Sequence, residues 1–229
     1  MKRIAILQSN YIPWKGYFDL INMVDEFILF DDVQYTKNDW RNRNKIKTRS
    51  GVSWLTIPVE KNNLTQLIKD TKVSSPIWQK KHWKTISQNY SKSKYFNDYK
   101  DLFEDLYLNT HENYLSEINY KFIKAICNML DIETKIRFSN EFTLEKGKTK
   151  RLLEICKQCN ANTYLSGASA KSYFDLNLAA KENIKIEWMD YSYSKEYKQL
   201  FAPFEHEVSI IDLIFNMGKD AKKYMMSFQ

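Results

Sequence analysis

The first thirty residues contain two short apolar runs separated by an apolar stripe at helical spacing. Arg3–Leu7 is mostly apolar and ends at a polar loop over 8–16, which predicts a buried strand. After the loop, apolar side chains recur three and four positions apart at Tyr17, Leu20, Ile21 and Val24. This spacing predicts a helix, and the apolar run 27–30 predicts a second buried strand. The segment is therefore expected to form a strand-helix-strand unit.

The pattern of the remaining chain extends the sheet and adds a helical region. A third strand is expected at 54–59, where Pro58 indicates a sheet edge or a bulge. Aromatic and aliphatic residues recur at helical spacing over 76–130, which predicts helices with aromatic side chains in the core. Further strands are predicted at 135–138, 163–166 and 185–189, and further helices at 148–158 and 173–183. This order predicts an α/β, Rossmann-like fold, a mostly parallel sheet flanked by helices, with a helical insertion around 76–130.

The last helix has a recognisable start signal. Ser209 precedes an apolar run and is expected to be its N-cap. Asp212 follows three residues later, which predicts a variant of the capping box.

Composition is consistent with one domain over 1–229. The chain has 229 residues, of which 43% are hydrophobic, enough for a continuous core. Its 15 Tyr, 13 Phe and 6 Trp residues suggest that some aromatic side chains line a site. The formal charge of +7 favours an anionic partner such as a nucleotide, phosphate, nucleic acid or membrane surface. Because Lys is frequent throughout, charge alone leaves a specific anion site open.

Cysteine usage favours a reducing compartment. The three cysteines are an odd number in a chain that needs no disulfide framework. Cys156 and Cys159 have the C-x-x-C spacing of a redox pair or metal site, but they lie in a helical run without a second ligand pair. Buried thiols and no metal are therefore expected. No apolar run is long enough for a signal peptide or a membrane span, so we expect a cytoplasmic protein without membrane insertion.

The loop between the first strand and the helix is the first candidate binding site. Free backbone N–H groups and the helix dipole at such a place attract phosphate or carboxylate groups. The candidate residues are Gln8, Asn10, Tyr11, Trp14, Gly16 and Tyr17. They supply hydrogen bonds, a stacking face and a close backbone approach. The alternative is that the aromatic residues only pack the loop onto the sheet.

A basic and aromatic stretch over 35–49 is the second candidate. Its five Lys and Arg residues between 37 and 47 face one acid, Asp39. Arg43 can grip a diphosphate and an aromatic ring can stack on a base or sugar. The candidate residues are Tyr35, Lys37, Trp40, Asn42 and Arg43. An exposed basic loop is the alternative, and single-stranded nucleic acid ranks lower because the patch is small.

Two further candidates follow predicted strands. Asp31 and Asp32 come after the second strand and point to opposite faces, so at most one enters a site. That residue could be a catalytic base, a partner for Arg43 or a strand-end cap. Ser166 ends the strand at 163–166 and Gly167 follows it, where small residues can admit a phosphate to backbone N–H groups. A structural turn is the alternative there.

These residues resemble the WbqC-like protein family. The family pattern Q-P-x-Y-x-P-W/Y-x-G-Y-F has its counterparts in Gln8, Tyr11, Pro13, Trp14, Gly16, Tyr17 and Phe18. The D-D-V-x-Y segment matches 31–35, and the N-R-N-x-I motif matches 42–46. Ser9 stands where Pro is usual, and Leu7 stands where some members carry His. A weaker likeness to nucleotidylyltransferases and pantothenate synthetase lacks both histidines of their H-x-G-H motif at 14–17.

The WbqC-like resemblance implies a role in bacterial surface-polysaccharide (O-antigen) biosynthesis. It implies transfer of an acyl or aminoacyl group, for example glycyl, to the amine of a nucleotide-linked amino sugar. The partners would then be a nucleotide-linked sugar and an acyl or aminoacyl donor. The weaker likeness supports a nucleotidylyltransferase-like layout of the first strand-helix-strand unit, but argues against adenylyl transfer.

Three functions remain open at this point. The first is the transferase, in which the loop 8–17 and Arg43 hold the diphosphate, Trp14 or Trp40 stacks, and Asp31 or Asp32 accepts a proton. The second is a non-catalytic binding or assembly component of the same pathway, and the third is a single-stranded nucleic-acid-binding protein. The transferase requires the loop 8–17 and the basic stretch to meet at one pocket. The cofactor, the sugar, the donor and the oligomeric state, including a homo-oligomer, stay open.

Overall fold

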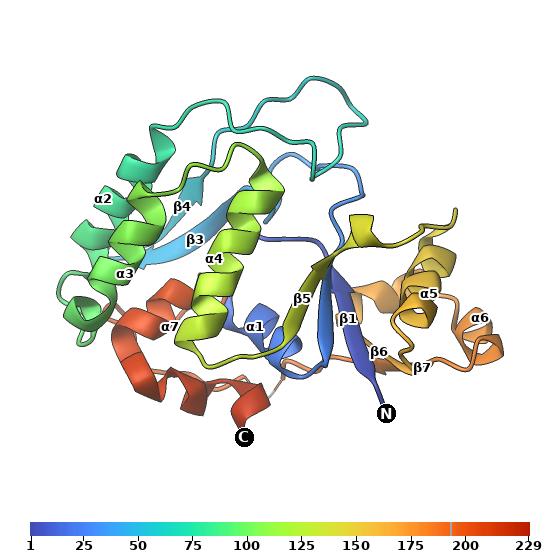
Figure 1. The fold of residues 1–229 in the computed structure, drawn as a ribbon. Coiled ribbons are helices and arrows are strands. Elements are labelled where there is room, and N and C mark those ends of the chain that lie inside the picture. Colours follow the sequence, from blue (N-terminus) through green and yellow to red (C-terminus); the bar gives the residue numbers. More distant parts are fainter. Residues whose placement is uncertain (193) are drawn as a thin grey trace.

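The structure is a computed structural model that describes residues 1–192 and 194–229. Its centre is a parallel sheet of five strands in the order β5-β2-β1-β6-β7 (Figure 1). The strands are β1 (Arg3–Leu7), β2 (Glu26–Leu29), β5 (Lys135–Phe138), β6 (Thr163–Ser166) and β7 (Lys185–Trp188). The α/β, Rossmann-like fold expected from the apolar pattern is therefore confirmed, and each of these strands lies within one residue of its expected position.

Helices cover both faces of the sheet (Figure 1). One face carries α1 (Lys15–Asn22), α2 (Trp78–Tyr90), α3 (Phe96–Leu108), α4 (Leu115–Met129) and α7 (Ile210–Met217). The other carries α5 (Lys148–Gln158) and α6 (Leu176–Lys181). Shorter 3-10 turns are η1 (Ser139–Glu141), η2 (Ala168–Ser172), η3 (Gly218–Tyr224) and η4 (Met226–Phe228). Among the described residues, none of the helices is long and apolar enough to cross a membrane.

The alternation of side chains along the central strands separates two cores. Ala5 of β1 and Phe27 of β2 join the core beneath α1 and α4, whereas Ile4 and Ile28 join the core beneath α5. Successive strand residues point to opposite faces, so apolar runs such as Arg3–Leu7 supply both cores at once. This explains why these strands were visible in the sequence as continuous apolar runs.

A separate β-hairpin corrects two sequence-based expectations. The stretch 54–59 was expected to be a third strand of the main sheet, and 35–49 was expected to be a loop. Instead β3 (Arg43–Thr48) and β4 (Gly51–Thr56) pair with each other in antiparallel register, with Arg43 opposite Thr56. Gly51 has a φ of 110°, which suits the tight turn between them. Asn and Lys disfavour strands in isolation, so β3 gave no apolar signal.

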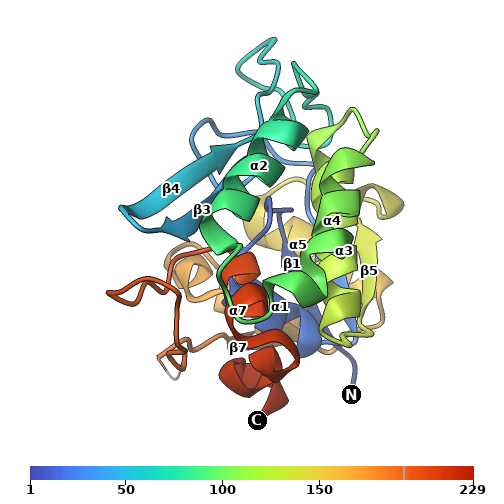
Figure 2. The same cartoon turned by 90° about the vertical axis from the view of Figure 1, so that its left-hand side faces the viewer.

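The hairpin packs beside α2 and α7 (Figure 2). The Lys47 N–H donates to the Tyr90 hydroxyl at 3.0 Å, and the Ser209 N–H donates to the Lys45 carbonyl at 2.8 Å. Ser209 is the N-cap of α7, as expected, and its hydroxyl accepts from the Ile211 N–H. Asp212 does not complete a capping box, because its buried carboxylate accepts hydrogen bonds from the hydroxyls of Tyr90 and Tyr197 instead.

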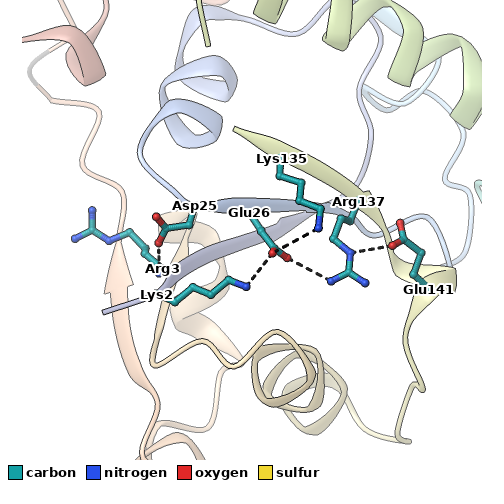
Figure 3. A network of polar contacts seen from close by, with 7 residues as sticks. All are labelled: Lys2, Arg3, Asp25, Glu26, Lys135, Arg137 and Glu141. Carbon is teal, nitrogen blue, oxygen red and sulfur yellow. Dashed lines mark hydrogen bonds and ion pairs between the residues drawn. The ribbon is translucent and has the colours of Figure 1, made fainter. Parts of the chain in front are cut away.

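A charged network ties the amino ends of β2 and β5 to the N-terminus (Figure 3). The Glu26 carboxylate accepts hydrogen bonds from Lys2 at 2.8 Å and from Arg137 at 3.3 Å. Arg137 also donates to Glu141 at 2.8 Å, and Lys135 lies 4.0 Å from Glu26. Burial opposes ionisation of Glu26, but these cations outweigh it and hold its pKa below the ordinary value.

Candidate functional site

The order of the strands creates a switch point between β1 and β6. The connection from β1 to β2 runs through α1 on one face, and the connection from β6 to β7 runs through α6 on the other. The two crossovers therefore leave in opposite directions, and their loops part at the carboxyl ends of β1 and β6. Open parallel sheets bind ligands in the crevice at such a point.

A cleft of about 520 Å³ occupies this place, and we call it the switch-point cleft. Its walls come from the carboxyl ends of β1 and β6, the segment after β2, the start of α5 and the turn η2. The polar side chains that line it belong to Gln8, Gln34, Lys148, Arg151, Tyr164, Ser166, Ser169 and Tyr173, and Gly167 lines it as well. Gln8, Ser166 and Gly167, which were predicted to bind substrate, are thus brought together from positions more than 150 residues apart.

Two cations of α5 give the cleft a positive wall. Lys148 lies over the ring of Tyr173, with Nζ 5.7 Å from the ring centre, and the Arg151 Nε donates to the Gly147 carbonyl at 3.1 Å. No carboxylate lies within ion-pairing distance of either cation among the described residues. The first turn of α5 has no acidic residue and no side-chain cap. Cations in the first turn of a helix are unfavourable, because the helix dipole places positive charge at the same end. An anion in the cleft would be stabilised by the two cations and by the helix dipole.

A second hollow of about 260 Å³ is lined in part by the same loop after β1, and we call it the tryptophan cavity. Its lining residues are Asn10, Pro13, Trp14, Trp40, Asn44 and Glu207. Gln8 lines the switch-point cleft and Asn10 the tryptophan cavity, and they are two residues apart. Their Cα atoms are therefore at most about 7 Å apart. The loop after β1 therefore contributes one residue to each hollow.

The loop 8–17 and the basic stretch were expected to meet at one pocket, and each contributes some residues to the tryptophan cavity. Trp14 of the loop and Trp40 of the stretch line the same cavity. Arg43 does not line it: its guanidinium lies on Trp54, 4.1 Å from the ring centre, and donates to the Asn38 carbonyl. The reason is the alternation of β3, which directs Asn44 inward and Arg43 to the opposite face.

Several predicted binding residues have structural positions instead. Tyr11 is fully buried, and its hydroxyl contacts the Tyr107 hydroxyl at 2.7 Å and His82 Nδ1 at 2.9 Å. Burial of His82 lowers its pKa to about 4, so the ring is neutral there. Tyr17 is also buried and donates to the Gln8 carbonyl at 3.0 Å. Both tyrosines therefore pack the loop onto the sheet, which was the alternative to ligand binding.

Gly16 leaves room for the Trp14 ring. A Cβ atom at this position would lie 2.4 Å from the Trp14 ring and 2.8 Å from Tyr191. The ring of Trp14 packs edge-on against Tyr191, with centroids 4.8 Å apart. The absence of a side chain at Gly16 thus lets Trp14 form a wall of the cavity.

The remaining candidates of the basic stretch lie outside both hollows. Tyr35 and Asn42 are buried, and the Asn42 amide donates to the Ile57 carbonyl at 2.8 Å. Lys37 is exposed. Asn42 therefore joins the segment after β4 to the stretch before β3.

Asp31 and Asp32 point to different partners, as expected for adjacent residues after a strand. Asp31 is 2% exposed and accepts hydrogen bonds from the Ser9 N–H at 2.8 Å and from the Ser116 hydroxyl. Burial raises its pKa, against these hydrogen bonds. Asp32 accepts from the Ser139 hydroxyl at 2.6 Å and pairs with Lys69. Neither carboxylate contacts Arg43, so that suggested pairing is wrong.

The sequence analysis gave no site role to Lys148, Arg151 or Glu207. Lys148 and Arg151 were placed in a helix without a role, although a basic first turn without an acid is an unusual start for a helix. Glu207 gave no signal, because its position follows from its ion pair with Lys45 of the hairpin. Among the described residues, no group of three or more His, Cys, Asp or Glu side chains could hold a metal ion.

Comparison with known proteins identifies the family of this chain. The model of the WbqC-like protein family matches residues 8–224. The uncharacterized protein Rv1507c of Mycobacterium tuberculosis is 46% identical over 226 residues, which cover 98% of each chain. No solved structure matches the chain.

Proposed function

The chain belongs to the WbqC-like protein family, and from this premise we propose that it transfers an acyl or aminoacyl group to the amine of a nucleotide-linked amino sugar. Such a product would serve bacterial surface-polysaccharide (O-antigen) biosynthesis. The diphosphate of the sugar nucleotide binds in the switch-point cleft. The observation that carries the proposal is the pair of cations, Lys148 and Arg151, which line the cleft without an acidic partner among the described residues.

The groups around the cleft suit a diphosphate. Arg151 can donate two parallel hydrogen bonds to phosphate oxygens, and Lys148 adds a second positive charge. Ser166 and Ser169 add hydroxyl donors from β6 and η2. The first backbone N–H groups of α5 have no acceptor within the helix, so they can donate to an anion.

The transfer needs a proton acceptor. The amine nitrogen attacks the carbonyl carbon of an activated donor such as a thioester, and the leaving group departs with the electron pair of the broken bond. The amine then gives up one proton. Of the two predicted carboxylates, Asp32 is the better candidate, because its side chain is 12% exposed and the next residue, Val33, lines the cleft. Asp31 is closed off by Ser9 and Ser116.

Substitution of the two cations tests the binding step. Lys148→Ala and Arg151→Ala should each weaken binding of UDP or dTDP about 10-fold, because each removes one charged donor to the diphosphate. Isothermal titration calorimetry gives the affinities. Lys150→Ala is the matched control, since Lys150 lies in the same helical turn but pairs with Glu145. Equal affinities for all three variants and the parent protein would show that the diphosphate does not bind in this cleft.

Mass spectrometry tests the transfer. Incubation of the protein with dTDP- or UDP-linked 4-amino sugars and acyl or glycyl thioesters should yield a new amide, and Asp32→Asn should reduce its rate while nucleotide binding persists. Binding without an amide from any donor would favour the non-catalytic component of the same pathway instead.

A further inference from the structure

Tyr173 presents a half-exposed aromatic ring to the switch-point cleft. It follows the turn η2, lines the cleft and is 50% exposed. Phe30 and Tyr164 line the cleft as well, but they are only 6% and 2% exposed. A large ring that remains open to solvent on a concave surface offers a face on which a flat group of a ligand can stack.

The Tyr173 ring lies beside the cations of the cleft. Lys148 Nζ is 5.7 Å from the centre of the ring, and Arg151, three residues further along α5, lines the same cleft. A ligand that suits both features carries an aromatic group and a phosphate group a short distance apart. Nucleotides have this arrangement, because one ribose joins the base to the phosphates.

Local contacts hold the segment of Tyr173 against α5. The Asp175 N–H donates to the Thr149 hydroxyl at 3.1 Å, which ties the chain after η2 to the first turn of α5. The residue next to Tyr173, Phe174, is buried and packs against Tyr164 with ring centroids 5.8 Å apart. The aromatic ring and the cationic turn are therefore placed together before a ligand arrives, which lowers the cost of ordering them on binding.

We propose that the base of a nucleoside diphosphate stacks on Tyr173 while its phosphates bind Lys148 and Arg151. This inference rests on the proposed function for the diphosphate, whereas the aromatic group of the ligand is argued from the exposure and position of Tyr173. Stacking uses the π face that every base has, so Tyr173 adds affinity without selecting one base over another.

The strand order gives the bound ligand a direction. Because β1 lies between β2 and β6, the segment after β2 and the turn η2 lie on opposite sides of the cleft. Two strand spacings put the ends of β2 and β6 about 10 Å apart. A base on Tyr173 lies on the β6 side, so the sugar beyond the diphosphate extends toward the β2 side. Asp32, the proton acceptor of the proposed transfer, follows β2.

Two ligands that differ by the nucleoside test the stacking. Isothermal titration calorimetry compares UDP with inorganic pyrophosphate. Tyr173→Ala should weaken UDP binding about 10-fold and leave pyrophosphate binding unchanged, because only UDP carries a base. Tyr173→Phe keeps the ring and should bind UDP as the parent protein does. Leu176→Ala is the control, since Leu176 is 55% exposed in the same segment but does not line the cleft.

The outcomes separate this inference from the proposed function. Unchanged UDP affinity in Tyr173→Ala, with pyrophosphate still dependent on Lys148 and Arg151, would overturn the stacking and retain the diphosphate site. An equal loss of UDP and pyrophosphate binding in Tyr173→Ala would also overturn it, since the ring would then act by holding Lys148. UDP binding that needs Tyr173 but neither cation would support the stacked base and contradict the placement of the diphosphate. If Tyr173→Ala unfolds, Tyr173→Leu replaces it, because it keeps an apolar side chain without a π face.

Discussion

At the scale of single residues, burial decides which polar side chains can meet a ligand. Asp31 and Asp32 are neighbours, yet Asp31 holds the loop after β1 through Ser9 and Ser116, whereas Asp32 binds Ser139 and Lys69. Alternation predicted from the sequence that at most one of them would enter a site. It could not say which, because that depends on α4, which covers Asp31 from a distant part of the chain.

Asp31 should make stability depend on pH in a defined direction. Burial raises its pKa above the ordinary value of 3.8, so the folded protein binds this proton more tightly than the unfolded chain does. Its contribution to stability is therefore fully present below about pH 3.8 and is lost as pH rises through the raised pKa. The free energy of unfolding of the parent protein minus that of Asp31→Asn should rise as the pH falls through this range. Urea unfolding at a series of pH values measures it, and a difference that falls on acidification would contradict the assignment.

Removal of the same side chain should be costly. Asp31→Ala leaves the buried Ser9 N–H and Ser116 hydroxyl without an acceptor, so we expect a loss of about 2–3 kcal/mol.

At the scale of elements, the strands and helices of the main sheet were largely readable and the hairpin was not. Buried parallel strands are apolar on both faces, so β1, β2 and β6 appear as runs in the sequence. The β3 strand, Arg43–Thr48, carries Arg, Asn and Lys, because one side faces solvent and the other side uses an amide to bind the loop before α1. Of the residues expected in the core of α3 and α4, Phe103, Tyr107 and Phe122 are buried, whereas Leu102 is 54% exposed.

The network at the amino ends of β2 and β5 should respond to pH in the opposite sense to Asp31. Lys2 and Arg137 hold the Glu26 pKa below its ordinary value of 4.5, despite burial. The stability that this carboxylate contributes is present above about pH 4.5 and is lost as pH falls through the lowered pKa. Glu26→Gln should therefore cost about 1 kcal/mol at pH 7 and almost nothing near pH 3. Thermal unfolding at both values measures the difference, and an equal cost at both would show that the ion pairs contribute nothing.

At the scale of the whole molecule, the candidate site depends on parts of the chain that meet only through topology. Gln8, Ser166 and Gly167 were found from the sequence because each follows a strand. Lys148 and Arg151 were missed because the crossover from β5 to β6 carries the start of α5 to the same edge, and no local pattern reports that path. The loop 8–10 contributes Gln8 to the switch-point cleft and Asn10 to the tryptophan cavity.

A crystal structure with a dTDP- or UDP-linked 4-amino sugar is the most direct test of where the ligand binds. The account predicts phosphate oxygens within about 3.2 Å of Lys148 Nζ and the Arg151 guanidinium. A diphosphate bound elsewhere on the molecule, with the switch-point cleft holding no part of the ligand, would contradict it.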